Sequence, residues 1–211
     1  MISSESIPGP AYRIITPQLV IRCPEPTDAT ALDLAIRQSL DYLLPWLLWA
    51  KQEPVSLQER IEFLRKVHGN FELGVDFGYV IFNPSETLLL GGTGLHTRLG
   101  QGAREIRYWI HKEHINHGYA TAVSAALTKV AFEVDQVKRV EIHCDLKNIR
   151  SASIPRKLGF IHEATLHNRV EDVFGNLRDT MVWTLFEENY PTSLAAQANI
   201  QAFDVIGRRI I

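Results

Sequence analysis

The sequence predicts a mixed α/β (α+β) fold in which helices flank one β-sheet. Three observations indicate this fold. Two amphipathic helices follow an early strand, two strand-like runs flank a short turn signal, and helices and strands then alternate up to residue 190. Such alternation is typical of layered α/β domains. The 211 residues are 45% hydrophobic and 22% charged, which is the composition of a globular protein with a sizeable core.

The early elements are one strand and two helices. The run QLVIRC, at residues 18–23, is the first predicted strand. A helix then begins within PEPTDATALDLAIRQSL, where Thr27 or Asp28 can cap it and the apolar residues keep helical spacing. A second helix begins at SLQERIEFLRKV, where Ser56 and Glu59 match a capping box.

Strands dominate the rest of the chain. GYVIFN and TLLLGGTGLH flank the turn signal NPSE, which indicates a hairpin. REIRYWIHK is another strand, a long helix spans about residues 118–132, and KRVEIHC is a strand rich in β-branched residues. IRSASIPRKLG predicts a short helix that ends at Gly159. FIHEATLH and LRDTMVWTLF are the last strands, so the predicted order is β-α-α-β-β-β-α-β-α-β-β.

The domain organisation follows from these elements. Residues 1–190 are expected to form a single domain, and residues 191–211 a C-terminal extension. The extension carries apolar residues, so it is expected to pack either on the domain or on a partner chain, and a homodimer is one expectation.

Composition and motifs exclude several partners. The net charge of -2 predicts no nucleic-acid partner. Cys23 and Cys144 lie far apart and show no metal-binding spacing, so no metal is expected and a reduced, cytoplasmic protein is the simplest interpretation. The N-terminal residues lack a secretory signal pattern, and the most apolar run, YLLPWLLWA, is too short to span a membrane.

The loop before the long helix is a candidate anion site. Gly118 precedes the helix, Ala120 is small, and Thr121 adds a hydroxyl. A helix N-terminus presents unpaired N–H groups and partial positive charge, which suit a phosphate when the loop allows close approach. The alternative is that Gly118 only relaxes the turn between strand and helix.

A second candidate segment, DLKNIRSASIPRKLGF, follows the next strand. It places Asn148 at the end of the strand and Ser151 at the start of a short helix. Each of these residues alone is also explained as a local helix cap.

Together the two segments resemble the GNAT superfamily of acyl-CoA-dependent N-acetyltransferases, and more narrowly its ribosomal-protein N-terminal acetyltransferase (Rim-type) branch. Residues 115–120 match the loop pattern Gln/Arg-x-x-Gly-x-Gly/Ala. Asn148, Ser151, Ile154 and the KLGF run match the branch's pattern Asn-x-x-Ser-x-x-aliphatic-x-x-Lys-Leu-Gly-Phe. EIRYWIHKE, TPQLVIRCPEPTDA and YLLPWLLWA also resemble this branch, so the likeness runs from about Thr16 to Tyr190.

The resemblance implies an acetyltransferase-like domain with a splayed mixed sheet. The strand ending YWI and the strand VEIHC would part, with the pantetheine of acetyl-CoA, the co-substrate, between them. The backbone near Ile110 would supply the N–H donor for the oxyanion. The residues assigned in this way to acetyl-CoA are Tyr108, Trp109, Ile110, His117, Gly118, Tyr119, Ala120, Thr121 and Asn148.

One position departs from the family pattern. Ile115 replaces the usual Gln or Arg that helps to hold the pyrophosphate, and Asn116 replaces a frequent Gly. We therefore expect weaker CoA binding, carried by the backbone N–H groups from His117 to Thr121, with His117 compensating when protonated.

Acetyl transfer needs a base for the amine and a proton for the CoA thiolate. The resemblance assigns the proton to Ser151, with Asn148 positioning the cofactor or Ser151. We favour Glu105 as the base, since it lies on the strand that leads to the loop. His143 is the second candidate, and it shares one strand face with Glu141.

The acceptor side carries its own candidates. Trp46 and Trp49 are expected either in the core or in the wall of a substrate cleft, and the resemblance favours the cleft. Glu171 lies near a carboxylate position of a relative, but the alignment puts Val170 there.

The expected activity is acetylation of a primary amine, either the N-terminal α-amine of a protein or a small-molecule amine. The alternative, raised by Ile115, is a non-catalytic acyl-CoA-binding or regulatory module. A third class is an interaction protein that uses its C-terminal tail and binds no CoA.

Overall fold

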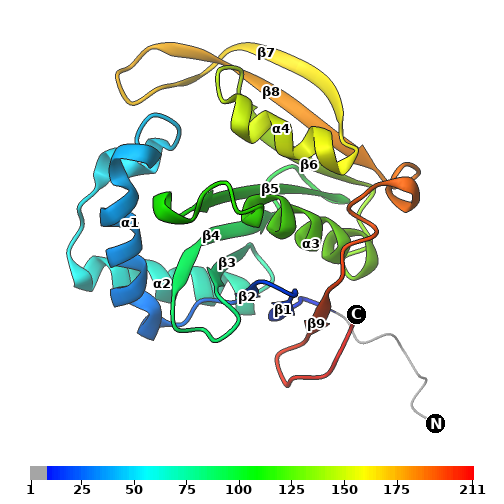
Figure 1. The fold of residues 1–211 in the computed structure, drawn as a ribbon, viewed down its shortest axis with the longest axis horizontal. Helices are drawn as coiled ribbons and strands as arrows, with labels where there is room; N and C mark the ends of the chain where they lie inside the picture. Colours follow the sequence, from blue (N-terminus) through cyan, green and yellow to red (C-terminus); the bar gives the residue numbers. More distant parts are fainter. Residues whose placement is uncertain (1–8) are drawn as a thin grey trace.

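The computed structural model describes residues 9–211 (Figure 1). Within these residues nine strands form one sheet in the order β7-β8-β6-β5-β4-β3-β2-β1-β9. The strands are β1 (Arg13–Ile15), β2 (Val20–Arg22), β3 (Phe77–Phe82), β4 (Leu89–His96), β5 (Ala103–Ile110), β6 (Arg139–Asp145), β7 (Ile161–Glu171), β8 (Leu177–Phe186) and β9 (Gln201–Phe203). The α-helices are α1 (Ala29–Leu43), α2 (Leu57–Glu72), α3 (Tyr119–Glu133) and α4 (Ile149–Leu158). The predicted α/β fold and element order are confirmed, and the structure adds β1 and β9.

The two early helices begin in different ways. The Ser56 hydroxyl accepts from the Glu59 N–H, and the Glu59 carboxylate accepts from the Ser56 N–H, so the predicted capping box of α2 is confirmed. Asp28, one of the two predicted cap residues, is the N-cap of α1, but its side chain makes no capping hydrogen bond. Asp28 instead accepts from Arg22 at 2.7 Å and from the Glu25 N–H at 2.7 Å, because a 3-10 turn precedes the helix.

Helices cover both faces of the sheet. Residues of α3 and α4 pack with Ile106 and Ile142 on one face. Residues of α1 and α2 pack with Val80 and Trp109 on the other face. Alternate residues of a strand point to opposite faces, so β5 contributes side chains to both layers.

The sheet opens between β5 and β6. These strands pair in parallel only from Ala103 with Arg139 to Ile106 with Ile142. Beyond that point β5 continues to Ile110, paired with β4, while β6 continues to Asp145, paired with β8. The predicted parting of these two strands is confirmed, and it leaves one edge of each strand unpaired.

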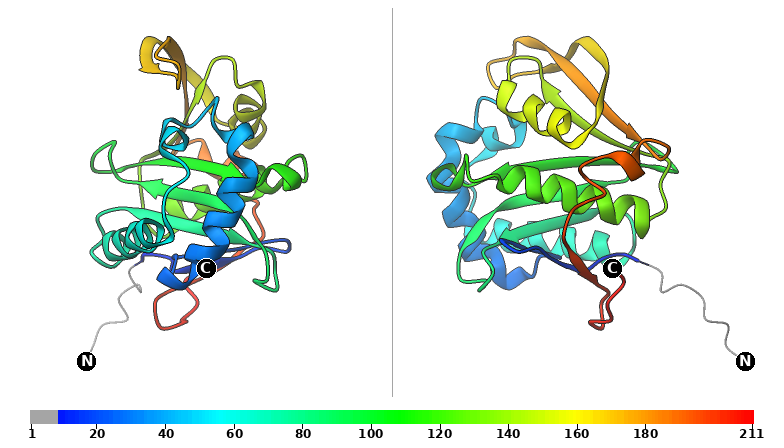
Figure 2. Two further views of the ribbon diagram at one scale, coloured as in Figure 1. Left: turned by 90° about the vertical axis from the view of Figure 1, so that its left-hand side faces the viewer. Right: turned by 45° about the vertical axis from the view of Figure 1, so that its right-hand side comes forward.

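Residues 191–211 pack on the same sheet. The segment runs from the end of β8 back to the other edge of the sheet, where β9 pairs with β1 (Figure 2). Ala195, Ile200 and Ala202 are buried in the main core. Across residues 9–211, none of the helices has the length and apolar character needed to cross a membrane.

This packing predicts that the tail stabilises the domain. Ile200→Ala is expected to lower the free energy of unfolding by about 2–5 kcal/mol, because it leaves a cavity in a core position. The matched change Leu194→Ala, at a side chain that is 57% exposed, is expected to alter it by about 0.5 kcal/mol or less. Urea unfolding of the two variants measures both values, and equal small effects would show that the tail contributes little stability.

Candidate active site

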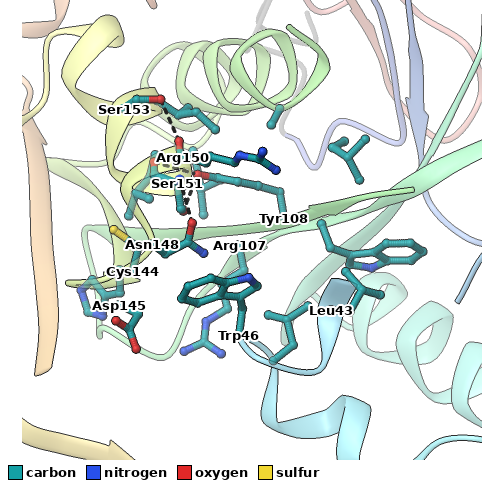
Figure 3. Close-up of a pocket in the computed structure, with 18 of the residues that line it drawn as sticks. Leu43, Trp46, Arg107, Tyr108, Cys144, Asp145, Asn148, Arg150, Ser151 and Ser153 are labelled. Atoms are coloured by element: carbon teal, nitrogen blue, oxygen red, sulfur yellow. Dashed lines mark hydrogen bonds between the residues drawn. The ribbon is translucent and has the colours of Figure 1, made fainter. Parts of the chain in front are cut away.

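A cavity of about 950 Å³ opens where β5 and β6 part (Figure 3). Its walls come from α1 and the segment after it, from β5 and the loop before α3, and from β6, α4, β7 and β8. The predicted site residues that line it are Trp46, Trp49, Tyr108, Trp109, Ile110, Gly118, Tyr119, Ala120, Thr121, His143, Asn148 and Ser151. Glu105 and His117 are not among the lining residues. The structure thus brings together predicted residues as far apart in the chain as Trp46 and Ser151, as the resemblance implied.

Strand geometry divides the cavity into two halves. Tyr108 packs against the core that holds α3, whereas its neighbour Trp109 packs against the core of α1 and α2. In Figure 3, Tyr108 reaches Ser151 of α4, and Trp46 lies on the opposite side of the β5 ribbon. We call the side of α3 and α4 the donor half and the side of α1 the acceptor half.

The loop at the donor half presents backbone N–H groups. Asn116 and Gly118 have left-handed φ angles of 64° and 81°, and no side chain caps α3. The first intrahelical bond runs from the Ala122 N–H to the Gly118 carbonyl at 3.0 Å. No described residue accepts from the N–H groups of Tyr119, Ala120 or Thr121. Three such groups beside a cavity fit the phosphates of CoA.

Ile115 has a structural role in this loop. It lines the cavity and packs against the main core, so it holds the loop by apolar contact. The N–H groups of the helix start are left uncovered by this arrangement, so the predicted anion site keeps its donors although residue 115 departs from the family pattern.

Gly118 is required for its backbone conformation. A Cβ added there would meet no described protein atom within 4 Å, so the space beside Gly118 is open to an approaching anion. The φ of 81° is what disfavours other residues, especially β-branched ones.

Gly118→Val is therefore expected to weaken acetyl-CoA binding by about tenfold or more, because relieving the strain of roughly 1–2 kcal/mol reorients the N–H groups. Calorimetric titration with acetyl-CoA measures the affinity. Gly175→Val is the matched control, since Gly175 has a φ of 84°, equally open surroundings and a place in the distant β7–β8 turn. Unchanged affinity in the first variant, or equal loss in both, would contradict the loop assignment.

His117 lies outside the cavity lining. Its Nδ1 donates to the Ile115 carbonyl at 2.9 Å, and its ring stacks on Tyr119 with centroids 5.6 Å apart. The geometry favours a role in shaping the loop over the direct phosphate contact that the sequence suggested.

A hydroxyl pair lies at the donor half. The Tyr108 and Ser151 hydroxyls are 2.9 Å apart, and the Asn148 side-chain oxygen accepts from the Ser151 N–H at 3.1 Å (Figure 3). Asn148 is thus both the cap of α4 and the residue that fixes Ser151. Burial raises the pKa of Tyr108 above its ordinary value, so the phenol stays protonated and can donate to Ser151.

Cys144 is the thiol that lines this half. Burial raises its pKa to about 11, so it stays a neutral thiol and a poor nucleophile near pH 7. The arrangement favours direct transfer from the thioester over an acetyl-cysteine intermediate.

Glu105 does not fit the role of general base. It is buried and accepts hydrogen bonds from Arg98 and from Arg107, the latter at 2.8 Å. Burial alone would raise its pKa, but the hydrogen bond from Arg98 and the charge of Arg107 outweigh burial and lower the pKa to about 2. A carboxylate so strongly held in its ionised form is a weak proton acceptor.

His143 fits the role better. It lines the acceptor half, and its Nε2 donates to the Glu141 carboxylate at 2.7 Å. Glu141 also accepts from Arg139 at 2.7 Å, so the pair is held in one orientation. With Nε2 protonated, Nδ1 carries the lone pair that can take a proton.

The two tryptophans lie in the wall of the acceptor half. Trp46 and Trp49 both line the cavity, and Trp49 meets Trp109 edge-on at 6.3 Å. Arg178 of β8 donates to the carbonyls of Pro45 at 3.3 Å and Trp46 at 3.1 Å. This contact between distant segments closes one side of the acceptor half.

Several charged residues that line the cavity were not among the predicted site residues. They are Arg107, Arg150, Lys157, Arg169 and Arg178. Arg150 and Lys157 lie seven residues apart in the chain, so helical periodicity puts them on one face of α4, beside the donor half. Val170 lines the cavity and Glu171 does not. Residues 9–211 hold no group of three or more His, Cys, Asp or Glu arranged for a metal ion.

Comparison with known proteins gives consistent relatives. The family described as acetyltransferase (GNAT) domain matches residues 18–161. YdaF of Bacillus subtilis (strain 168), provisionally named a ribosomal N-acetyltransferase, is 30% identical over 182 residues, which are 83% of this chain and 95% of YdaF.

Solved structures share the fold. RimJ of Mycobacterium smegmatis, in complex with CoA-disulfide, is 21% identical, covers 88% of this chain and 92% of its own, and has a TM-score of 0.74. The microcin C7 self immunity acetyltransferase MccE, in complex with acetyl-CoA and AMP, is 17% identical, covers 81% of this chain and 93% of its own, and also has a TM-score of 0.74.

Proposed function

The chain belongs to the GNAT family of N-acetyltransferases, which use acetyl-CoA, and from this premise we propose that it acetylates the N-terminal α-amine of a protein. The observation that carries the proposal is the cavity between β5 and β6, whose acceptor half is walled by tryptophans and lies on the sheet face opposite the phosphate loop. An extended chain end can enter there while acetyl-CoA enters from the other face. The name of YdaF supports a ribosomal-protein acceptor.

The donor half would hold acetyl-CoA. The N–H groups of Tyr119, Ala120 and Thr121 would bind phosphate, and Arg150 and Lys157 would add charge. The free edge of β5 would pair with the pantetheine, which places the thioester beside the Ser151 hydroxyl.

The transfer then follows from the residues on either side. His143 takes a proton from the ammonium group, and the neutral amine attacks the thioester carbonyl. The C–N bond forms, the C–S bond breaks, and the CoA thiolate takes a proton from Ser151, which shares a hydrogen bond with Tyr108. The amide nitrogen releases its second proton to water, which returns a proton to the hydroxyl pair, and His143 releases the first proton to solvent.

The alternatives have less support. The non-catalytic module rested on Ile115, and that residue packs into the core without covering the phosphate loop. A small amine is the remaining alternative for the acceptor. A cytoplasmic location agrees with two cysteines that are both free and buried. A homodimer is also proposed, and sedimentation of the full chain tests it.

The acceptor is tested by following CoA release with three substrate sets. These are peptides with a free N-terminus, the same peptides with a blocked N-terminus and a free lysine, and small amines. Acetylation of the first set alone is expected. Turnover only with blocked peptides or only with small amines would overturn the proposal.

A further inference from the structure

The part of the cavity outside α4 carries unbalanced positive charge. Its charged lining residues are Arg107, Arg169, Arg178 and a single carboxylate, Asp145. Asp145 is engaged by Arg178 at 3.2 Å, and Arg178 also holds two backbone carbonyls, so these two charges neutralise each other.

Two further carboxylates on this face of the sheet, those of Glu105 and Glu141, are buried and paired with cationic side chains. The Glu105 side chain is only 2% exposed and forms ion pairs with both Arg98 and Arg107, so two guanidinium groups share one negative charge. Glu141 is likewise held by Arg139 and His143. What an incoming acceptor meets at the surface is therefore guanidinium.

Arg169 adds a further cation. It lines the cavity from β7, next to Val170, and forms none of the ion pairs found within residues 9–211. The cavity thus has at least one guanidinium with hydrogen-bonding capacity to spare, Arg169, and a second, Arg107, that shares its carboxylate with Arg98.

The acidic groups that would suit a cationic acceptor lie elsewhere. Asp41 pairs with Lys112, Glu53 pairs with the buried Arg60, and Glu25 lies near His68. None of the three lines the cavity. A polyamine or a lysine-rich chain end would bring positive charge against arginine, which is unfavourable.

Resting on the proposed function, we infer that the acceptor is an acidic protein N-terminus, one that carries Asp or Glu within its first few residues. The arginine fork binds a carboxylate in two parallel hydrogen bonds, and such charge-assisted bonds are the strong ones. The amine then approaches His143 while the acidic side chain is held by Arg169 and Arg107. The same chemistry would accept a free acidic amino acid, and the test separates the two sources.

The test uses three peptides that differ only at their second and third positions. These positions hold aspartate in the first peptide, asparagine in the second and lysine in the third. At low peptide concentration, kcat/KM is expected to fall in that order, by about tenfold or more between the acidic and basic peptides. Added salt is expected to narrow the difference.

Arg169→Glu assigns the effect to the cavity. It is expected to abolish or reverse the preference, and folding is preserved because Arg169 is exposed. Arg65→Glu makes the same charge change on α2, outside the cavity, and is expected to keep the preference.

The outcomes separate the two proposals. Equal kcat/KM for the three peptides, or a preference that Arg169→Glu leaves intact, overturns the acidic acceptor while N-terminal acetylation stands. Acetylation of free aspartate and of small amines with no peptide turnover overturns both.

Discussion

His143→Gln is expected to lower kcat/KM by about a hundredfold or more, with acetyl-CoA affinity unchanged. Glutamine can keep a hydrogen bond to Glu141 through its amide N–H, so the strand and the pair geometry survive. The amide cannot accept the proton of the ammonium group, and the fraction of neutral amine near pH 7 is small because an α-amine has a pKa of about 8. Steady-state kinetics and calorimetry measure the two quantities.

A matched histidine separates catalysis from stability. His96 also pairs with a carboxylate, Asp76, at 2.8 Å, and it lies outside the cavity. His96→Gln is expected to leave kcat/KM nearly unchanged. If His143→Gln behaves in the same way as His96→Gln, water or the acceptor itself must remove the proton.

Local signals explain what the sequence predicted well. Ser56 and Glu59 stand three residues apart, and that spacing alone specifies the capping box found at the start of α2. Gly118 and Gly159 both have left-handed φ angles at helix ends, which is where glycine is favoured. The prediction that β5 and β6 part was based on the family resemblance and not on residue patterns.

The site electrostatics were harder to predict because they depend on contacts between distant segments. Arg178 meets Pro45 and Trp46 across more than 130 residues, and no local pattern specifies that contact. β9 likewise pairs with β1 from the opposite end of the chain.

The ion pairing of Glu105 had a signal that could be read from the sequence. Arg107 stands two residues after Glu105 on the same strand, so both side chains share a face and can pair. The same reasoning that joined Glu141 and His143 would have joined these two. The contribution of Arg98, from the preceding turn, could not be read in this way.

Ser151→Ala is expected to lower kcat by about tenfold to a hundredfold and to change acetyl-CoA affinity by less than about twofold. The loss is smaller than for His143 because a thiolate, with a thiol pKa near 8.5, can leave unprotonated and take a proton from water afterwards. The cap of α4 survives, since Asn148 accepts from the backbone N–H of residue 151 and not from its hydroxyl.

Two further variants interpret the result. Tyr108→Phe removes the partner hydroxyl at 2.9 Å and is expected to give a smaller loss of kcat than Ser151→Ala, because Ser151 can still donate one proton. Ser193→Ala removes a buried hydroxyl that donates to the Tyr190 carbonyl at 2.7 Å, far from the cavity, and is expected to leave kcat unchanged. If Ser151→Ala and Tyr108→Phe both turn over at the wild-type rate, water protonates the thiolate. The hydroxyl pair would then serve to hold α4 against β5, and the two variants would lose stability without losing catalysis.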